Sequence, residues 1–371
     1  MECSYFGVCG SCKIYQDGYQ SQLNYKINKI EKEFGDISDL EIFSSPPIHY
    51  RARAEFRIIH DGNRIHYGMW HRDGSHLIAI DSCPIVSEAI FNYMPKLKEE
   101  IAKSPVLSQK LFSVEFLSNR KGDIVVTLIY HRKLDSEWKQ EAEKLSNSKI
   151  SVIGRSRGVK ITIGKEYIDE VVEVGEKKYI LKHLENSFSQ PNPFVNEKMV
   201  NWAVEQTEKI EKRDLLIELY CGSGNFTIPL SSKFRRVIAT EIAKSGIATA
   251  KENIERNGIE NIELGRVSSS EFVEAIDGKR EFFRLRDMNL KNIDLETLLV
   301  DPPRAGLDST TLEFASRFQN IIYISCNPET LKRDLESLQK THKIASFALF
   351  DQFPYTPHIE SGVLLKKVLD S

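Results

Sequence analysis

Short apolar segments alternate with longer helical stretches through the second half of the chain. Each apolar segment has the length of a buried strand, and the stretches between them are long enough for crossover helices. The five segments lie at residues 215–220, 235–240, 262–267, 297–301 and 321–325. Two further strand-like runs follow at 345–353 and 361–368. This alternation is typical of a doubly wound, Rossmann-like α/β domain, and it predicts a mostly parallel, seven-stranded sheet within residues 183–371.

The first half, residues 1–182, has a different pattern that predicts a separate α+β domain. Apolar side chains recur at helical spacing from Asp17 to Phe34, which predicts a helix. Strand-like runs form two predicted hairpins, 52–60 with 64–71 and 113–119 with 123–131. The first pair flanks Asp61-Gly62-Asn63, a sequence typical of hairpin turns. Later runs in this half favour more antiparallel sheet.

The overall charge excludes a globally basic coat for nucleic acid. Lys and Arg total 51 against 53 Asp and Glu among 371 residues, a formal net charge of −2. A local basic surface remains compatible with this balance, because binding depends on where the charges lie. No run approaches the roughly 20 apolar residues that span a bilayer, and the N-terminus lacks the apolar core of a signal peptide. We therefore expect a cytoplasmic protein that does not bind membranes.

A glycine-containing turn follows the first strand of the predicted sheet. Gly222 and Gly224 in ELYCGSGNF allow a tight turn and close approach of a ligand to the backbone. Glu241 ends the next strand, where an acidic side chain can accept hydrogen bonds from both hydroxyls of a ribose. The third glycine of the dinucleotide motif is missing, so S-adenosylmethionine (SAM) fits better than NAD. A structural strand–helix turn is the simpler alternative.

Reactive side chains follow three later strands. Asp301 and Arg304 belong to Asp-Pro-Pro-Arg after one strand, and Cys326 belongs to Ser-Cys-Asn-Pro after the next. His358 and Glu360 stand just before the last strand, and either one can act as a base. Ligands of such sheets gather at the carboxyl ends of the strands. The alternatives are two prolines that end a strand, an ordinary buried thiol and a His-x-Glu sequence without a function.

This set of groups suits methylation of carbon 5 of uracil. That carbon is a poor nucleophile until a thiolate adds at carbon 6 and loads negative charge onto it. It then attacks the SAM methyl group, and a base removes the carbon 5 proton so that the thiol can leave. Cys326 and Glu360 supply the nucleophile and the base, and Arg304 can stabilise the developing negative charge.

Six sequence segments carry a resemblance to a known family. They are NSFSQPN (186–192), ELYCGSGNF (218–226), VIATEIA (237–243), VDPPRAGLD (300–308), YISCNPETL (323–331) and ALFDQFPYTPHIESGVLL (348–365). With them the chain resembles the RNA uracil-5-methyltransferases, and most closely the tRNA (uracil-5-)-methyltransferases.

The resemblance implies a nucleophile at Cys326 and a base at Glu360. The SAM contacts that it implies are Gln190, Tyr220, Asn225, Glu241 and Asp301. The implied substrate is uridine 54 in the T-loop of the tRNA T-arm, flipped into the pocket because its faces are otherwise stacked. We expect neither DNA nor an obligate protein as a partner. The alternatives are the same chemistry on 23S rRNA and an inactive RNA-binding module.

Four cysteines of the first half point toward the rRNA branch. Cys3, Cys9, Cys12 and Cys83 resemble the iron–sulfur ligand set of those relatives. Four thiolates suit a [4Fe–4S] cluster or tetrahedral zinc, and we favour the cluster. The alternative is a set of ordinary reduced thiols. Segments 190–192 and 351–356 resemble the tRNA branch instead.

A local basic strand is the candidate RNA contact. Arg51, Arg53 and Arg57 stand at alternate positions together with Glu55, so a strand would place them on one face. Such a face can contact phosphates, with an affinity that falls as salt rises. The sequence around these residues also resembles the RNA-contacting region of the family. The alternative is a solvated strand face.

Overall fold

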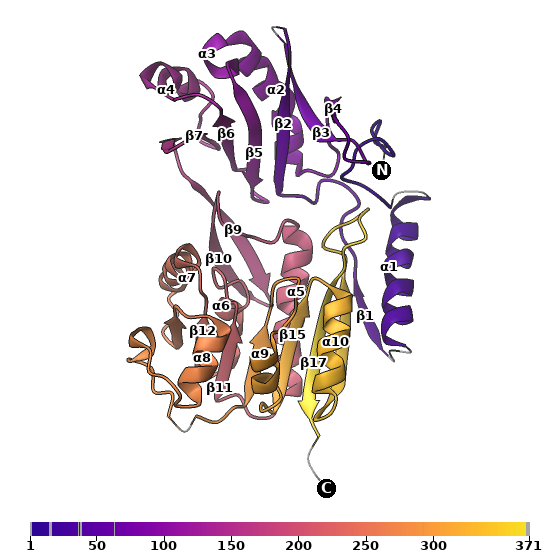
Figure 1. Cartoon of the computed structure of the whole chain (residues 1–371), viewed down its shortest axis with the longest axis vertical. Coiled ribbons are helices and arrows are strands. Elements are labelled where there is room, and N and C mark those ends of the chain that lie inside the picture. The colour runs from indigo at the N-terminus through magenta and orange to yellow at the C-terminus, as the bar shows by residue number, and fades with distance from the viewer. Residues whose placement is uncertain are drawn as a thin grey trace.

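The computed structural model describes residues 2–14, 17–35, 37, 39–62, 64–291 and 293–368. Two large sheets lie at opposite ends of the molecule, and a two-stranded hairpin lies between them (Figure 1). The sheet of the second half holds the candidate site.

The sheet of the second half contains all seven strands that the sequence predicts. Five run parallel: β11 (Leu215–Leu219), β12 (Arg236–Thr240), β13 (Ile262–Gly265), β14 (Thr297–Val300) and β15 (Asn320–Ser325). Beyond β15 lie β17 (Glu360–Lys367) and then β16 (His342–Phe350), and β17 is antiparallel to both neighbours. The strand order, β16-β17-β15-β14-β11-β12-β13, confirms the doubly wound fold.

An eighth strand corrects the prediction of seven. β1 (Leu40–Phe43) comes from the first half and pairs in parallel with β16 at the edge of the sheet. Four residues are too few for a clear periodic pattern, so the sequence gives little sign of this strand. Its pairing covers backbone groups that an edge strand would otherwise expose.

Helices cover both faces of this sheet, as the crossover connections require. One face packs against α5 (Pro193–Gln206), α6 (Thr227–Leu230) and α7 (Lys244–Arg256). The other packs against α8 (Ser269–Ile276), α9 (Ser309–Ala315), α10 (Pro328–Leu338) and α1 (Gly18–Phe34). Leu23 and Ile30 of α1 are buried in this second core. The predicted helix at 17–34 is therefore confirmed, but it packs on the second sheet although it precedes residue 183.

A seven-stranded sheet makes up most of the first half. Its order is β4 (Leu77–Ile80), β3 (Arg64–Trp70), β2 (Arg53–Asp61), β5 (Leu111–Ser118), β6 (Ile124–Tyr130), β7 (Ile150–Ser156) and β8 (Val159–Ile163). Helices α2 (Glu88–Lys103), α3 (Pro105–Ser108) and α4 (Ser136–Glu143) pack on one face. The hairpins β2–β3 and β5–β6 are confirmed, although Asn63 of the first turn lies outside the described residues. β7 pairs with β6 in parallel instead, because α4 forms a crossover between them.

The hairpin of β9 (Tyr167–Val174) and β10 (Lys177–Leu184) connects the two large sheets. Its β9 strand contacts α5 and its β10 strand contacts α7. On the other side, Ile168 joins a small apolar cluster with side chains of β5, β6 and β7. The hairpin is thus packed against both halves.

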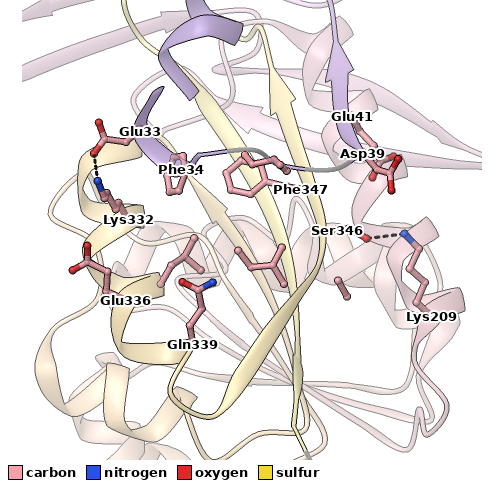
Figure 2. Close-up of a pocket in the computed structure, with 14 residues that line it drawn as sticks. Glu33, Phe34, Asp39, Glu41, Lys209, Lys332, Glu336, Gln339, Ser346 and Phe347 are labelled. Atoms are coloured by element: carbon pink, nitrogen blue, oxygen red, sulfur yellow. Dashed lines mark hydrogen bonds and ion pairs between the residues drawn. The ribbon is translucent and has the colours of Figure 1, made fainter. Parts of the chain in front are cut away.

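A surface cavity of about 530 Å³ lies where α1 ends, beside α10 and β16 (Figure 2). An ion pair of 3.4 Å joins Lys332 to Glu33 at its rim, and Lys209 Nζ donates to Ser346 Oγ at 2.6 Å. None of the predicted site residues lines this cavity. Within the described residues, no helix is long and apolar enough to cross a bilayer.

Candidate active site at the carboxyl edge of the sheet

A cavity of about 620 Å³ lies at the carboxyl ends of β11, β12, β14 and β15, and we call it the carboxyl-edge cavity. Every catalytic and cofactor residue that the sequence predicts lines it: Gln190, Tyr220, Asn225, Glu241, Asp301, Arg304, Cys326 and Glu360. These residues come from six separate segments of the chain. They meet because parallel strands deliver their ends to one edge of the sheet.

The glycine turn brings bare backbone to one wall of this cavity. Gly222 and Gly224 have φ angles of 56° and 90°, in the left-handed region that favours glycine. A β-carbon at Gly246, in the first turn of α7, would lie 3.2 Å from the Gly222 carbonyl oxygen. The Glu241 carboxylate accepts the Gly222 N–H at 3.1 Å and the Ala243 N–H at 2.6 Å. It is therefore fixed between the turn and the start of α7.

Hydrogen bonds between side-chain amides hold the other polar groups of the wall. Gln352 donates from Nε2 to Gln190 Oε1 at 2.8 Å. Asn225 and Asn196 exchange two side-chain bonds of 2.8 and 2.9 Å. Because each amide has a partner, its orientation is set before any ligand binds.

The antiparallel strand β17 brings Glu360 close to Cys326. The last paired residues of the two strands are Ser325 of β15 and Ser361 of β17. Cys326 is the next residue after Ser325, Glu360 precedes Ser361, and the charge of Glu360 acts on the Cys326 thiol. Because β17 is antiparallel to β15, it begins at the edge of the sheet where the parallel strands end. Thiol and carboxylate therefore lie side by side in the cavity.

Burial and like charge hold the acidic groups of the cavity toward their neutral forms. Burial and the nearby Asp301 carboxylate raise the pKa of Glu360 well above its usual value. Burial raises the pKa of Asp301 to about 7. Burial, Glu360 and Asp301 together raise the pKa of the Cys326 thiol to about 11. Shifts of this kind, in a cleft, are typical of sites where protons are transferred.

Two cations oppose these shifts, and they differ in burial. The charges of Lys26 and Arg304 both lower the pKa of Glu360. Arg304 is exposed, and its Nη2 lies 3.3 Å from His358 Nδ1. Burial and the charge of Arg304 lower the pKa of His358, so its imidazole is neutral at neutral pH. Lys26 is completely buried.

The sequence analysis missed two titratable residues that line the carboxyl-edge cavity. Burial raises the pKa of Glu218, within β11, to about 8. Burial and the charge of Arg53 lower the pKa of His183, within β10, to about 4. His183 Nδ1 finds no hydrogen-bond partner among the described residues. Both residues lie inside strands, where only the tertiary arrangement shows that they face a cavity.

The three candidate RNA-binding arginines have different surroundings. Arg53 donates from its guanidinium to the carbonyl oxygens of Leu184, Glu185 and Ser187, at 2.7 to 3.1 Å. Arg51 donates from Nε to the Arg53 carbonyl oxygen at 2.8 Å. The bonds of Arg53 join β2 to the last residue of β10 and to the segment that follows it.

Arg57 is instead part of a stack on the open face of the first sheet. Its guanidinium lies 4.2 Å from the centre of the Phe112 ring. The Phe112 ring in turn stacks on the His131 ring, with centroids 4.1 Å apart. Phe112 lies at a bulge of β5, and the sequence analysis missed it. Beside this stack, a cavity of about 740 Å³ is lined by the basic residues His131, Arg132, Lys133, Arg155 and Arg157.

The four N-terminal cysteines lie near one another, and all are free thiols. Burial and the neighbouring Cys83, Cys9 and Cys3 thiols raise the pKa of Cys12 to about 12. Burial, Cys9 and Cys3 likewise raise the pKa of Cys83 to about 11. Among the described residues, no three of these sulfurs lie within 4.8 Å of one another. The thiols therefore form a loose, partly buried group.

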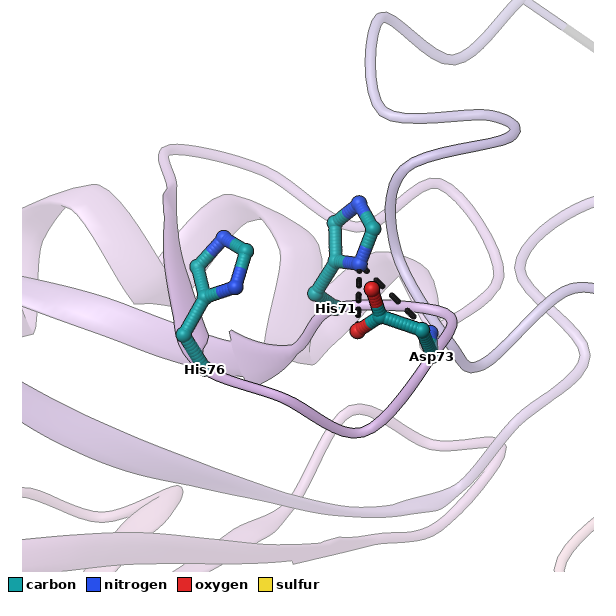
Figure 3. Close-up of side chains that lie close together, drawn as sticks. All are labelled: His71, Asp73 and His76. Atoms are coloured by element: carbon teal, nitrogen blue, oxygen red, sulfur yellow. Dashed lines mark hydrogen bonds and ion pairs between the residues drawn. The ribbon is translucent and has the colours of Figure 1, made fainter.

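His71, Asp73 and His76 form a tighter cluster in the turn between β3 and β4 (Figure 3). Their potential ligand atoms all lie within 4.8 Å. The Asp73 carboxylate, however, is already engaged by His71 Nδ1 at 2.7 Å, the Ser75 N–H at 2.8 Å and the Ser75 hydroxyl at 2.5 Å. These bonds close the turn, which gives the carboxylate a structural role.

The pKa of Cys326 predicts how its reactivity depends on pH. With a pKa near 11, the thiolate fraction is small at neutral pH and grows about tenfold per pH unit up to pH 10. Alkylation of the folded protein by iodoacetamide, followed at the Cys326 peptide by mass spectrometry, should rise in the same way. The Cys326→Ala variant gives the background from the other thiols. A plateau below pH 9 would contradict the expected pKa.

Comparison with known proteins identifies the family of this chain. A family model described as tRNA (Uracil-5-)-methyltransferase matches residues 18–368. A tRNA/tmRNA (uracil-C(5))-methyltransferase of a Nitratiruptor species is 50% identical over 99% of this chain and 100% of its own length. A protein of the same name from Acinetobacter baumannii (strain ACICU) is 48% identical over 94% of this chain and 99% of its own.

The fold also matches a solved structure. The tRNA (uracil-54, C5)-methyltransferase of Pyrococcus abyssi, in complex with S-adenosyl-L-homocysteine, superposes with a TM-score of 0.71. The match covers 94% of this chain and 83% of that one, at 23% identity. The full-length matches confirm the resemblance seen in the sequence motifs. The chain belongs to the tRNA (uracil-5-)-methyltransferase family.

Proposed function

We propose that the protein methylates carbon 5 of a uridine in the T-loop of tRNA, uridine 54, in the cytoplasm with SAM as methyl donor. The main support is that Cys326 and Glu360 lie close together in one cavity, where β15 ends and β17 begins. The reaction needs a nucleophile at carbon 6 of uracil and a base at the adjacent carbon 5. The names of the full-length relatives support tRNA as the substrate.

The side chains of the cavity divide the reaction between them. The Cys326 thiolate forms a bond to carbon 6 of the flipped uracil, which places negative charge on carbon 5 and oxygen 4. SAM, when bound, supplies an electrophilic methyl group to carbon 5. Glu360 then takes the carbon 5 proton, the bond between sulfur and carbon 6 breaks, and the thiolate of Cys326 is restored. Arg304, at the mouth of the cavity, is placed to stabilise the negative charge on the base.

The wall of the cavity that holds the glycine turn and Glu241 suits the methyl donor. Glu241 has acceptor capacity left for ribose hydroxyls after its two backbone bonds. Gln190, Tyr220, Asn225 and Asp301 are the further SAM contacts in this proposal. The left-handed φ of 65° at Tyr220 turns the chain at the end of β11, and its hydroxyl donates to Ser269 Oγ at 2.9 Å. This wall is therefore preorganised.

Transfer of labelled methyl groups tests the reaction. The wild-type protein, methyl-labelled SAM and an unmodified tRNA transcript should give label at the T-loop uridine. Cys326→Ala should lower the rate by more than about 10³-fold, because carbon 5 is then not activated. Glu360→Gln should leave a labelled covalent protein–tRNA adduct, because the carbon 5 proton cannot be removed. Glu263→Gln, which changes a partly exposed ion pair with Arg236, is the matched control.

A fragment of 23S rRNA is the competing substrate in the same assay. Label in the rRNA fragment alone would assign the protein to rRNA. Absence of label in both RNAs, with folded protein, would favour an RNA-binding module without activity.

We propose that the stack of Arg57, Phe112 and His131, with the basic cavity beside it, contacts the tRNA. Aromatic rings accept unpaired bases by stacking, and the neighbouring cations suit phosphates. Arg53 is less suited to this role, because its guanidinium already donates to three carbonyl groups of the chain.

Binding of tRNA at several salt concentrations tests this surface. Arg57→Gln should weaken binding and reduce the slope of log Kd against log salt by about one. Phe112→Leu should weaken binding by about 1–3 kcal/mol with the salt slope unchanged. Arg235→Gln, exposed at the amino end of β12, is the control. Unchanged affinity in both variants would place the RNA elsewhere.

We also propose that Cys3, Cys9, Cys12 and Cys83 hold an iron–sulfur cluster with a structural role. The support is the mutual electrostatic contact of the four thiols and the packing of Cys12 and Cys83 beside Tyr50 and Tyr355. A zinc tetrahedron would bring its sulfurs to about 3.8 Å from one another. Among the described residues no three of these sulfurs lie within 4.8 Å of one another, which favours the larger cluster.

Metal analysis of anaerobically purified protein tests the cysteine site. We expect the protein to contain iron and sulfide and to show the visible absorption spectrum of a [4Fe–4S] centre. The Cys12→Ser variant should lose both the iron and the sulfide. The Cys221→Ser variant, whose thiol lies in the glycine turn, should keep the metal. Zinc in place of iron would assign a zinc site, and absence of both metals would leave ordinary thiols.

A further inference from the structure

Three polar side chains of α1 converge on one carboxylate beside the active site. Tyr19, Gln22 and Lys26 stand on one face of the helix because they are spaced by three and four residues. Their donors reach Asp351, the first residue after β16. Tyr19 Oη lies 2.8 Å and Gln22 Nε2 2.7 Å from Asp351 Oδ2, and Lys26 Nζ lies 2.6 Å from Oδ1.

The ion pair of Lys26 and Asp351 is completely buried. Both side chains have 0% exposure. Burial lowers the pKa of Lys26, while Asp351 and Glu360 raise it. A charge pair withdrawn from water in this way is held in place by its remaining hydrogen bonds, and here α1 supplies them.

The same helix also holds the backbone of the loop between β16 and β17. Lys26 Nζ donates to the Phe353 carbonyl oxygen at 2.8 Å. The Tyr355 N–H donates to Gln22 Oε1 at 3.1 Å. This loop ends at Glu360, and Glu360 pairs with Phe350, the residue before Asp351. The α1 contacts therefore fix both the loop and the strand start that carry the carboxylate.

Four charged or titratable groups surround the Glu360 carboxylate, and they come from three segments. Asp301, just after β14, opposes its ionisation, and the thiol of Cys326, just after β15, interacts with it. Arg304, in the loop after β14, and Lys26 favour its ionisation. Arg304 is exposed to solvent, whereas Lys26 is buried, so Lys26 is the cation whose position the fold determines.

We propose that Lys26 is a positioning residue for the final step of the reaction: it fixes the Glu360 loop through Asp351 and Phe353, and its charge favours the carboxylate form of Glu360 over the neutral acid. This inference rests on the proposed function. Glu360 can take the carbon 5 proton only as a carboxylate. Without the ammonium group its pKa rises, so at a given pH less carboxylate is present. The methylated adduct on Cys326 is then released more slowly, most strongly at low pH.

A single-turnover experiment with methyl-labelled SAM and unmodified tRNA measures this step. The readouts are labelled adduct that resists SDS and labelled free tRNA, followed between pH 6 and pH 9. Lys26→Met should release product from the adduct up to about tenfold more slowly than wild type near pH 6.5, and so hold more adduct, if the pKa of Glu360 rises by about one unit. The difference should narrow as pH rises. Lys332→Met, which removes the surface ion pair between α10 and α1, should behave as wild type.

A second variant covers the case in which Lys26→Met does not fold. Lys26→Gln combined with Asp351→Asn removes both charges and keeps groups that can hydrogen-bond, so no charge is left buried without a partner. It should accumulate adduct with the same pH dependence. Melting temperatures of all variants separate lost stability from lost proton transfer.

Glu360→Gln separates the two proposals. If it accumulates adduct while folded Lys26 variants release product as wild type does at every pH, the role of Lys26 is overturned and the proposed function stands. If the wild type transfers no methyl group to tRNA, the proposed function itself fails.

Discussion

The reversed direction of β17 is the constraint on which the candidate site depends. In a purely parallel sheet every strand begins at the edge away from the ligand, so a residue at the start of a strand cannot reach it. β17 is antiparallel between β15 and β16, and its first residue, Glu360, therefore lies where the other strands end. The last ladder pair, Ser325 with Ser361, then places that carboxylate near Cys326. The proposed base and nucleophile therefore each adjoin a residue that is fixed in the sheet.

The same geometry creates an electrostatic difficulty. Asp301, Glu360 and the Cys326 thiol are all acids. Burial holds each toward its protonated form, and repulsion from neighbouring acids adds to this for Glu360 and Cys326. The proposed nucleophile and base act only when ionised, so the proposed reaction needs positive charge nearby. Arg304 supplies it from the solvent side and Lys26 from the protein interior. The substrate pocket thus draws on a helix that lies more than 300 positions away from Glu360 in the chain.

That helix shows how the two halves of the sequence are joined. α1 and β1 belong by position to the first half, yet α1 buries its apolar side in the core of the second sheet and β1 extends that sheet. The β9–β10 hairpin packs against both large sheets, and Arg53 bonds the segment after it to β2. The two large sheets are consequently parts of one packed structure.

The sequence alone determined the strands and helices whose patterns are local. Seven strands, the α1 helix, the glycine turn and the motifs around Asp301, Cys326 and Glu360 follow from periodicity, turn chemistry and resemblance, because each needs only neighbouring residues. Only the tertiary structure showed that β1 is an eighth strand of the sheet, that Lys26 pairs with Asp351, and that the guanidinium of Arg53 bonds to the backbone. Alternation along β2 places Arg53 on an open face, but its guanidinium donates to carbonyl groups at the end of β10 and just after it. Such contacts join segments that are distant in the sequence. Their strength depends on burial in the folded protein, and burial of this kind cannot be predicted from the residues next to each group.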